Sequence, residues 1–118
     1  DHFKKFNDTY GHDIGDKILM QLTEMLALKV RNRDIFARWG GEEFVILLPV
    51  TKLEEAQKVA EHLRQAIEEH LFYNNLRVTC SFGVAQVEQN DTEQTALKRA
   101  DEALYVAKQN GRNRVEIA

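Results

Sequence analysis

The chain has 118 residues, 43% of them hydrophobic and 30% charged, which fits one domain with a single core. Its formal net charge of −3 argues against a general nucleic-acid-binding protein, which would carry an excess of basic residues. The single cysteine, Cys80, excludes an internal disulfide bond and suits a reducing compartment, so we expect a cytoplasmic location. We expect no signal peptide, because the chain starts with the polar DHFKKFND, and no membrane span, because no apolar run reaches about 18 residues.

The first half of the chain predicts two helical segments followed by a β-hairpin. Phe3 and Phe6 have the spacing of one face of a short helical turn, and the stretch GHDIGD after it is expected to form a loop. Asp16 is a suitable N-cap for a second helix, in which apolar residues between positions 18 and 30 recur at helical intervals. DIFARW and FVILLPV, residues 34–39 and 44–50, are rich in β-forming residues and flank GGEE, which indicates a hairpin.

The second half of the chain alternates helices with single strands. Thr51 and Glu54 have the spacing of a capping box at the start of a helix over residues 51–70. LRVTCSFGVAQV is expected to form a strand, bent at Gly83, and TALKRADEALYVAKQN a second amphipathic helix that stops at Gly111. RVEIA is expected to form a last strand. This order predicts an α+β domain in which helices pack on a mostly antiparallel sheet.

The hairpin tip RWGGEEF combines two glycines with two carboxylates. Gly40 and Gly41 permit positive φ and a close approach of the backbone to a ligand, and Glu42 and Glu43 follow on a rigid base. Adjacent strand residues point to opposite faces, so we expect one glutamate to face a ligand while the other braces it. A carboxylate in such a place can ligate Mg²⁺ or act as a general base for a hydroxyl. The alternative is a solvated hairpin tip whose charges only keep it soluble.

Four stretches of the chain together resemble the GGDEF family, the diguanylate cyclase domains. RWGGEEFVILLP resembles the family signature, with glutamate at the first acidic position. DHFKKFNDTYGHDIGD resembles the segment between the family's first strand and its following long helix, VTCSFGVA the strand after the fourth helix, and ADEALYVAKQNGRN the terminal helix. The resemblance covers essentially the whole chain and implies a nucleotidyl-cyclase and polymerase-palm-like fold with a ferredoxin-like βαββαβ core.

The resemblance also implies that part of the family's fold lies before Asp1. The family's first strand ends in D-x-D, and Asp1 corresponds to the second of these aspartates. The N-terminal helices, the first strand and the first aspartate, which completes the metal site, are therefore expected to precede it. Residues 1–118 are expected to be a GGDEF domain that lacks these parts.

Members of the family join two GTP molecules into cyclic di-GMP, releasing pyrophosphate, and act as homodimers with Mg²⁺ or Mn²⁺. By resemblance, Glu42 and Glu43 bind the metal, and Glu42 takes the proton of the 3′-hydroxyl group. Lys4 is implied to stabilise charge on the phosphates, and Gly40 and Gly41 to lie against the nucleotide.

The resemblance assigns guanine recognition to Asn7 and Asp16, whose amide and carboxylate groups complement the guanine edge, while His12 is the weaker candidate. Lys108 and Arg112 correspond to the family's phosphate clamps, and they can face the same way if the last helix continues that far. Each assignment has a simpler alternative. Asn7 can be a turn residue, Asp16 can be an N-cap, and the two cations can stabilise a helix C-terminus.

RNRD, residues 31–34, matches the family's R-x-x-D inhibition site, at which the product binds. The resemblance thus implies a product site at Arg31 and Asp34, and the alternative is a surface ion pair. Some members use a second arginine to cross-link two domains through bound product. His62 stands at that position here, with Arg64 two residues on, which leaves open whether Arg64 replaces it.

Two functions from different classes follow from these residues. The first is a diguanylate cyclase with product inhibition, and the second is a catalytically inactive domain that binds cyclic di-GMP or GTP. For either, we expect a sensor or regulatory domain in the parent protein, no nucleic-acid polymer as a partner and no membrane contact by this domain.

Overall fold

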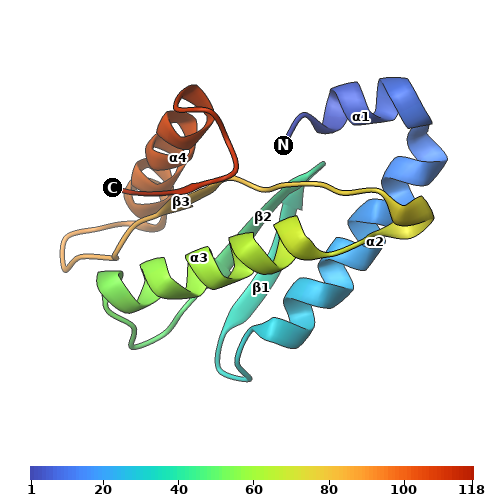
Figure 1. Ribbon diagram of the computed structural model, residues 1–118. Helices are drawn as coiled ribbons and strands as arrows, with labels where there is room; N and C mark the ends of the chain where they lie inside the picture. The colour runs from blue at the N-terminus through green and yellow to red at the C-terminus, as the bar shows by residue number, and fades with distance from the viewer. The chain divides into compact units, whose positions relative to one another are not determined.

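The computed structural model describes all 118 residues, which form two compact units. We call residues 2–50 together with 71–77 the hairpin unit, and Asp1 with residues 51–70 and 78–118 the C-terminal unit. Figure 1 labels most of their helices and strands. Each unit combines helices with one two-stranded sheet, so the predicted α+β class is confirmed.

The hairpin unit begins with two consecutive helices. Helix α1 (Phe3–Tyr10) and helix α2 (His12–Lys29) are separated by Gly11 alone. Gly11 has φ 90° and is the N-cap of α2, so the chain passes from one helix to the next within a single residue. Asp16 consequently lies inside α2. The predictions of a loop over GHDIGD and of Asp16 as an N-cap are therefore wrong.

Helix α1 packs closely against the start of α2. The rings of Phe3 and Phe6 stack with their centroids 6.2 Å apart, which confirms that they share one face of α1. Gly15 of α2 lies so near α1 that a Cβ atom there would be 1.8 Å from Asn7 Oδ1. The predicted apolar stripe of α2 is also confirmed, since its members Ile18, Leu22 and Leu26 are buried, and Leu19 is buried beside them.

Strands β1 (Ile35–Gly40) and β2 (Glu43–Leu47) form the predicted antiparallel hairpin. The rings of Phe36 and Phe44 stack on it with centroids 5.5 Å apart. The pairing skips Trp39, which makes a β-bulge just before the turn. A bulge of this kind bends and twists a strand locally, so it helps to set the direction of the hairpin tip.

The segment 71–77 docks on α2 through the short 3-10 turn η1 (Tyr73–Asn75). The Tyr73 N–H donates to Gln21 Oε1 over 2.7 Å. Lys17 Nζ donates to the Tyr73 hydroxyl over 3.1 Å and lies 4.3 Å from the centroid of the same ring. These contacts attach a segment that is remote in sequence to the first helices of the unit.

The C-terminal unit packs two helices on a parallel strand pair (Figure 1). Helices α3 (Leu53–Glu69) and α4 (Glu93–Gln109) both contact β3 (Phe82–Val84) and β4 (Val115–Ile117). The strand predicted over residues 76–87 is reduced to the three residues of β3, because only these pair with β4. The buried hydrophobic residues of the two helices are Ala60, Leu63, Ile67, Ala103 and Ala107.

The helix ends differ in part from the sequence prediction. Lys52, not Thr51, is the N-cap of α3, and its side chain makes no capping hydrogen bond, so the predicted capping box is wrong. The chain does form a capping box, but at α4, where Thr92 and Thr95 bond reciprocally. The predicted stop of α4 at Gly111 is confirmed, since this residue follows the C-cap with φ 116°.

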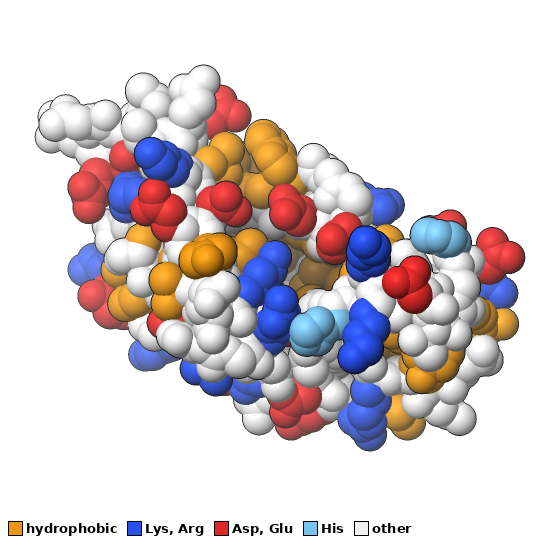
Figure 2. Space-filling model, turned by 90° about the horizontal axis from the view of Figure 1, so that it is seen from above, with side chains coloured by type: hydrophobic (Ala, Val, Ile, Leu, Met, Phe, Trp, Pro, Cys, Tyr) orange, Lys and Arg blue, Asp and Glu red, His pale blue; other side chains and the backbone are white.

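The surface carries charges of both signs. On the face shown in Figure 2, acidic and basic side chains are interspersed, with hydrophobic groups between them. No helix of the structure combines the length and the apolar character that crossing a membrane requires. Cys80 is a free thiol, and desolvation by the surrounding protein raises its pKa, which disfavours the reactive thiolate.

Gly83 in the middle of β3 allows the strand to approach α4 closely. A Cβ atom at this position would lie 2.1 Å from the carbonyl oxygen of Ala100 and 2.4 Å from the backbone nitrogen of Leu104. Backbone atoms of a packed helix cannot move aside as the end of a flexible side chain can.

We therefore expect Gly83→Ala to destabilise the domain by at least about 2 kcal/mol, the size of a strongly overpacked core position. Urea denaturation measures the change in the free energy of unfolding. Gly40→Ala is the matched control, because nothing lies within 4 Å of a Cβ atom at position 40. Equal stability of the two variants would contradict the close approach of β3 to α4.

Candidate active site

The hairpin tip is a tight turn of Gly41 and Glu42 between the paired residues Gly40 and Glu43. Gly41 has φ 49°, a backbone conformation that side chains disfavour. Arg38 Nε donates to the Gly41 carbonyl oxygen over 2.7 Å. The turn is therefore braced from β1, and both glutamates start from a constrained backbone.

Glu42 and Glu43 are exposed, and neither carboxylate has a hydrogen-bond or ion-pair partner. Glu42 belongs to the turn, so the alternation expected for adjacent strand residues applies only from Glu43 onward. No group of three or more His, Cys, Asp and Glu side chains is placed to hold a metal ion. Mg²⁺ is commonly bound through one or two carboxylates, with water and substrate phosphates completing its shell. The two glutamates fit that mode of binding.

Asn7, in the middle of α1, carries a buried amide oxygen without a partner. Its Oδ1 atom is shielded from solvent and accepts no hydrogen bond from the protein. Leaving such a group unpaired costs about 1–3 kcal/mol, and folded proteins retain few of them. The position inside a helix also rules out the alternative of a turn residue. Asn7 therefore carries a polar group whose hydrogen-bonding capacity the folded protein leaves unused.

A groove of about 480 Å³ lies beside Asp16 in the hairpin unit. This volume is in the usual range for small-molecule sites. Asp16 is exposed and its carboxylate has no partner, so it remains available as an acceptor. Apolar and charged side chains meet in this groove, a mixture that suits a flat polar ring. The lining residues are Asp16, Leu19, Met20, Thr23, Glu24 and Arg38.

Arg38 is a candidate that the sequence analysis left without a role. Its side chain both lines the Asp16 groove and binds the Gly41 carbonyl oxygen, so it connects the groove with the glutamate turn inside one unit. The available signal was the cation two residues before the glycine pair in RWGGEEF. A guanidinium in such a place can bind an anionic ligand through charge-assisted hydrogen bonds.

Lys4 and His12 occupy helix starts in the hairpin unit. Lys4 lies in the first turn of α1 and His12 is the first residue of α2, and both are exposed. Neither side chain has a hydrogen-bond partner, and neither lines the Asp16 groove.

Arg31 and Asp34 form a two-pronged ion pair in the turn between α2 and β1. Arg31 Nε and Nη2 each bind a different oxygen of Asp34 over 3.1 Å, and the Arg31 N–H donates to the same carboxylate over 2.9 Å. The Asp34 side chain is 1% exposed, whereas that of Arg31 is 39% exposed. Hydrogen bonding from the guanidinium lowers the pKa of the Asp34 carboxyl group below its ordinary value of 3.8. The pair thus stays charged and fixes one guanidinium at the surface.

Lys108 and Arg112 belong to the C-terminal unit. Helix α4 ends at Gln109, and Arg112 follows with φ 64°, so the helix does not continue far enough to make the two cations helical neighbours. Lys108 lies in the last turn, where a cation is favourable.

Arg64 is engaged within the C-terminal unit. Its guanidinium binds Glu61, Glu68 and Asn113, and its side chain is only 15% exposed. The Arg64 guanidinium is therefore not available at the surface as a second arginine for bound product. His62, two residues earlier, is exposed.

The chain matches one protein family and several known proteins. The sequence profile described as "Diguanylate cyclase, GGDEF domain" matches residues 1–114. Diguanylate cyclase DgcP of Pseudomonas aeruginosa is 46% identical over 121 residues, which cover 100% of this chain and 18% of that protein. Diguanylate cyclase DgcM of Escherichia coli K12 is 46% identical over 118 residues, covering 100% of this chain and 29% of that protein. The chain thus spans less than a third of the length of either relative.

Solved structures of such domains share the fold. The GGDEF domain of DgcB from Caulobacter crescentus, in complex with c-di-GMP, aligns with a TM-score of 0.93 at 32% identity, over 99% of this chain and 72% of that one. The active GGEEF domain of a diguanylate cyclase from Vibrio cholerae aligns with a TM-score of 0.91 at 39% identity, over 99% and 76%. The expected cyclase-palm-like fold is thereby confirmed. Because the family profile also matches nearly every residue, the chain belongs to the diguanylate cyclase, GGDEF domain, family.

Proposed function

We propose that this domain joins two GTP molecules into cyclic di-GMP and releases pyrophosphate. The observation that carries the proposal is the braced GGEE turn, whose two exposed carboxylates have no protein partner, in a chain of the diguanylate cyclase family. A turn that served only solubility would not need the hydrogen bond from Arg38 to the Gly41 carbonyl oxygen, which fixes its backbone. Paired carboxylates without partners are instead what a metal-dependent phosphoryl-transfer site requires.

In the proposed reaction, the 3′-hydroxyl group of each GTP attacks the α-phosphate of the other. Glu42 accepts the proton of the attacking hydroxyl, and Glu43 helps to orient the bound triphosphate. Glu42 and Glu43 would hold Mg²⁺ or Mn²⁺, which would supply positive charge against the polyphosphate and the reacting phosphate. Because each molecule supplies both a nucleophile and an electrophile, the proposed active species is a homodimer with one GTP per subunit.

Base recognition is proposed for Asn7 and Asp16. The Asn7 side-chain amide, whose Oδ1 has no partner within the protein, would hydrogen-bond to the guanine edge, and the Asp16 carboxylate would accept from guanine N–H groups. The groove beside Asp16 offers apolar contact with the flat ring through Leu19 and Met20. His12 is a secondary candidate at the start of α2.

Phosphate binding is proposed for cations that the protein leaves without anionic partners. Lys4, Lys108 and Arg112 have no ion pair or side-chain hydrogen bond, so their charges are available to a ligand. Gly40 and Gly41 would let the backbone approach the nucleotide, since neither carries a side chain that could obstruct it.

Product inhibition is proposed at Arg31 and Asp34. The ion pair fixes the orientation of a guanidinium that remains 39% exposed, so cyclic di-GMP would meet an arginine that is already ordered. A preordered side chain reduces the entropy cost of binding. Cross-linking of two domains through Arg64 is not included, because the contacts of that guanidinium lie within its own unit.

A catalytically inactive domain that binds cyclic di-GMP or GTP is the second candidate. The Arg31–Asp34 pair is compatible with it, whereas the intact glutamate turn favours the cyclase. Turnover of GTP by the protein that carries this domain separates the two. In either case we propose a cytoplasmic domain under the control of a further regulatory domain, since GTP and reduced thiols occur in that compartment.

Glu42→Gln in the protein that carries this domain should lower GTP turnover by at least about a hundredfold, because one side chain is lost both as metal ligand and as base. Pyrophosphate release with Mg²⁺ measures the rate. Glu55→Gln on α3 makes the same chemical change at an exposed helix position and should leave the rate unchanged. Near-normal turnover by Glu42→Gln would remove Glu42 from the mechanism.

Asp16→Asn should lower the preference for GTP over ATP by about tenfold, because a carboxylate acceptor for guanine N–H groups is replaced in part by a donor. Competition of each nucleotide against a fluorescent GTP analogue measures the preference. Asp13→Asn, an identical change one turn earlier on α2, should retain it. Equal competition by GTP and ATP against the unaltered protein would refute the roles of Asn7 and Asp16.

Arg31→Ala should raise the concentration of cyclic di-GMP that halves the rate by about tenfold or more, because a charge-assisted contact is worth about 1.5–3 kcal/mol. Initial rates at increasing product concentration give this value. Arg33→Ala removes an exposed arginine of the same turn that makes no hydrogen bond, so inhibition should persist. Unchanged inhibition of the Arg31 variant would exclude the site.

A further inference from the structure

The loop after α4 has an unusual backbone. Gly111, Arg112 and Asn113 are three consecutive residues with positive φ, at 116°, 64° and 46°. Glycine adopts such angles readily, whereas arginine and asparagine do so at a cost, and asparagine is the more tolerant of the two. A conformation of this kind persists only where surrounding contacts impose it.

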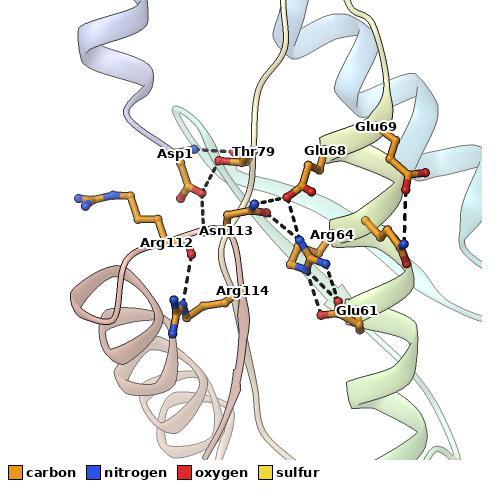
Figure 3. A network of polar contacts seen from close by, with 10 residues as sticks. Asp1, Glu61, Arg64, Glu68, Glu69, Thr79, Arg112, Asn113 and Arg114 are labelled. Carbon is orange, nitrogen blue, oxygen red and sulfur yellow. Dashed lines mark hydrogen bonds and ion pairs between the residues drawn. The ribbon is translucent and has the colours of Figure 1, made fainter.

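Asn113 is held by contacts from two directions, and these impose the left-handed backbone of the loop (Figure 3). The Asn113 N–H donates to Asp1 Oδ2 over 3.1 Å, and the same carboxylate accepts from the Thr79 hydroxyl group at 2.9 Å. It also accepts from the Ser81 hydroxyl group at 2.7 Å. Asp1 therefore ties the loop to the segment that leads into β3.

The second contact comes from helix α3. Arg64 Nη1 donates to Asn113 Oδ1 over 2.9 Å, and the Asn113 amide nitrogen donates to Glu68. Arg64 is itself held by Glu61 and Glu68, so its position does not depend on the loop. The Asn113 side chain therefore binds a donor, Arg64, and an acceptor, Glu68, whose positions helix α3 fixes.

In this loop the backbone of Arg112 is fixed while its side chain remains available to a ligand. Its carbonyl oxygen accepts from Arg114 Nε over 3.2 Å, and its N–H donates to the Ala107 carbonyl oxygen over 2.9 Å, so its backbone is held on both sides. Its guanidinium has no hydrogen-bond or ion-pair partner. Figure 3 shows this side chain extending away from the Asp1 and Arg64 contacts.

We infer that Arg64 and Asp1 are positioning residues for Arg112: through Asn113 they hold the left-handed loop that presents the Arg112 guanidinium to a nucleotide phosphate. The inference rests on the proposed function, from which the phosphate role of Arg112 is taken. The inference adds Arg64 and Asp1, which do not contact the ligand and act only by fixing Arg112, which does.

The test is a double-mutant cycle between Arg64→Met and Arg112→Ala in the protein that carries this domain. Arg112→Ala should weaken GTP binding by about tenfold or more, and Arg64→Met by about fivefold, because the loop loses one of its anchors. The double variant should bind no more weakly than Arg112→Ala alone. Additive losses would overturn the inference, since Arg64 would then act independently of Arg112.

Amide hydrogen exchange in the protein without ligand gives a readout that does not depend on the nucleotide. Arg64→Met should speed exchange of the Arg112 and Asn113 amides by about fivefold or more. Gln65→Met is the matched control, because Gln65 binds only Glu69 on its own helix. Exchange unchanged from that control would overturn the inference.

Failure of the proposed function would appear differently. If Arg112→Ala leaves GTP affinity unchanged, the phosphate role of Arg112 is refuted, and the inference is overturned with it even where the exchange result holds. Asp1→Ala tests the second anchor by the same exchange measurement. Ser81→Ala serves as its control, since it removes one hydrogen bond to Asp1 and leaves the Asp1–Asn113 bond in place.

Discussion

The contact between Asn7 of α1 and Gly15 of α2 fixes how the two helices of the hairpin unit pack, and with them the two residues proposed to recognise guanine. The two helices approach this closely only because residue 15 lacks a Cβ atom, which would otherwise lie 1.8 Å from the Asn7 amide oxygen. Their connection through Gly11 alone makes the approach possible, because no longer loop intervenes. The result is a buried acceptor without a donor. Such a group lowers stability, and departures from full hydrogen bonding tend to occur where a ligand completes them.

Charged residues in this chain divide into those that build structure and those left to a ligand. Arg64 with Glu61 and Arg99 with Asp91 satisfy one another and hold helices and loops in place. Outside the proposed product site, the charged residues that resemblance assigns to substrate or metal binding have no such partners; they are Lys4, Asp16, Glu42, Glu43, Lys108 and Arg112. Exposed single charges are common and prove little alone. Within the hairpin unit, Lys4, Asp16, Glu42 and Glu43 supply unpaired charges of both signs, which is what a polyanionic ligand bound with a cation requires.

Sequence patterns predicted the features whose causes are local. The hairpin follows from β-forming residues around GGEE, and the stop at Gly111 follows from the left-handed residue that ends a helix. The capping box at Thr92 does not match the usual sequence pattern, because Thr95 supplies the reciprocal bond in place of Glu or Gln. The start of α2 was misplaced because one glycine takes the place of the loop that the polar stretch suggested.

Contacts between distant residues could not be predicted in the same way. The bond between Asp1 and Asn113 joins residues 112 positions apart, and no spacing pattern reports such a pair. The position of Arg38 in the Asp16 groove likewise depends on how the hairpin folds back on α2. By contrast, the Arg31–Asp34 pair was visible as R-x-x-D because its members share one turn.

That ion pair also shows that a structural and a functional interpretation of one motif need not compete. The Asp34 carboxylate is almost fully covered, accepts from the Arg31 backbone as well as its guanidinium, and has a lowered pKa, all of which stabilise the turn into β1. The same bonds restrict the Arg31 side chain, which would otherwise lose several rotamers on binding a ligand. A guanidinium ordered for structural reasons thereby becomes a better recognition group, so the ion pair expected as the simpler alternative supports the proposed product site.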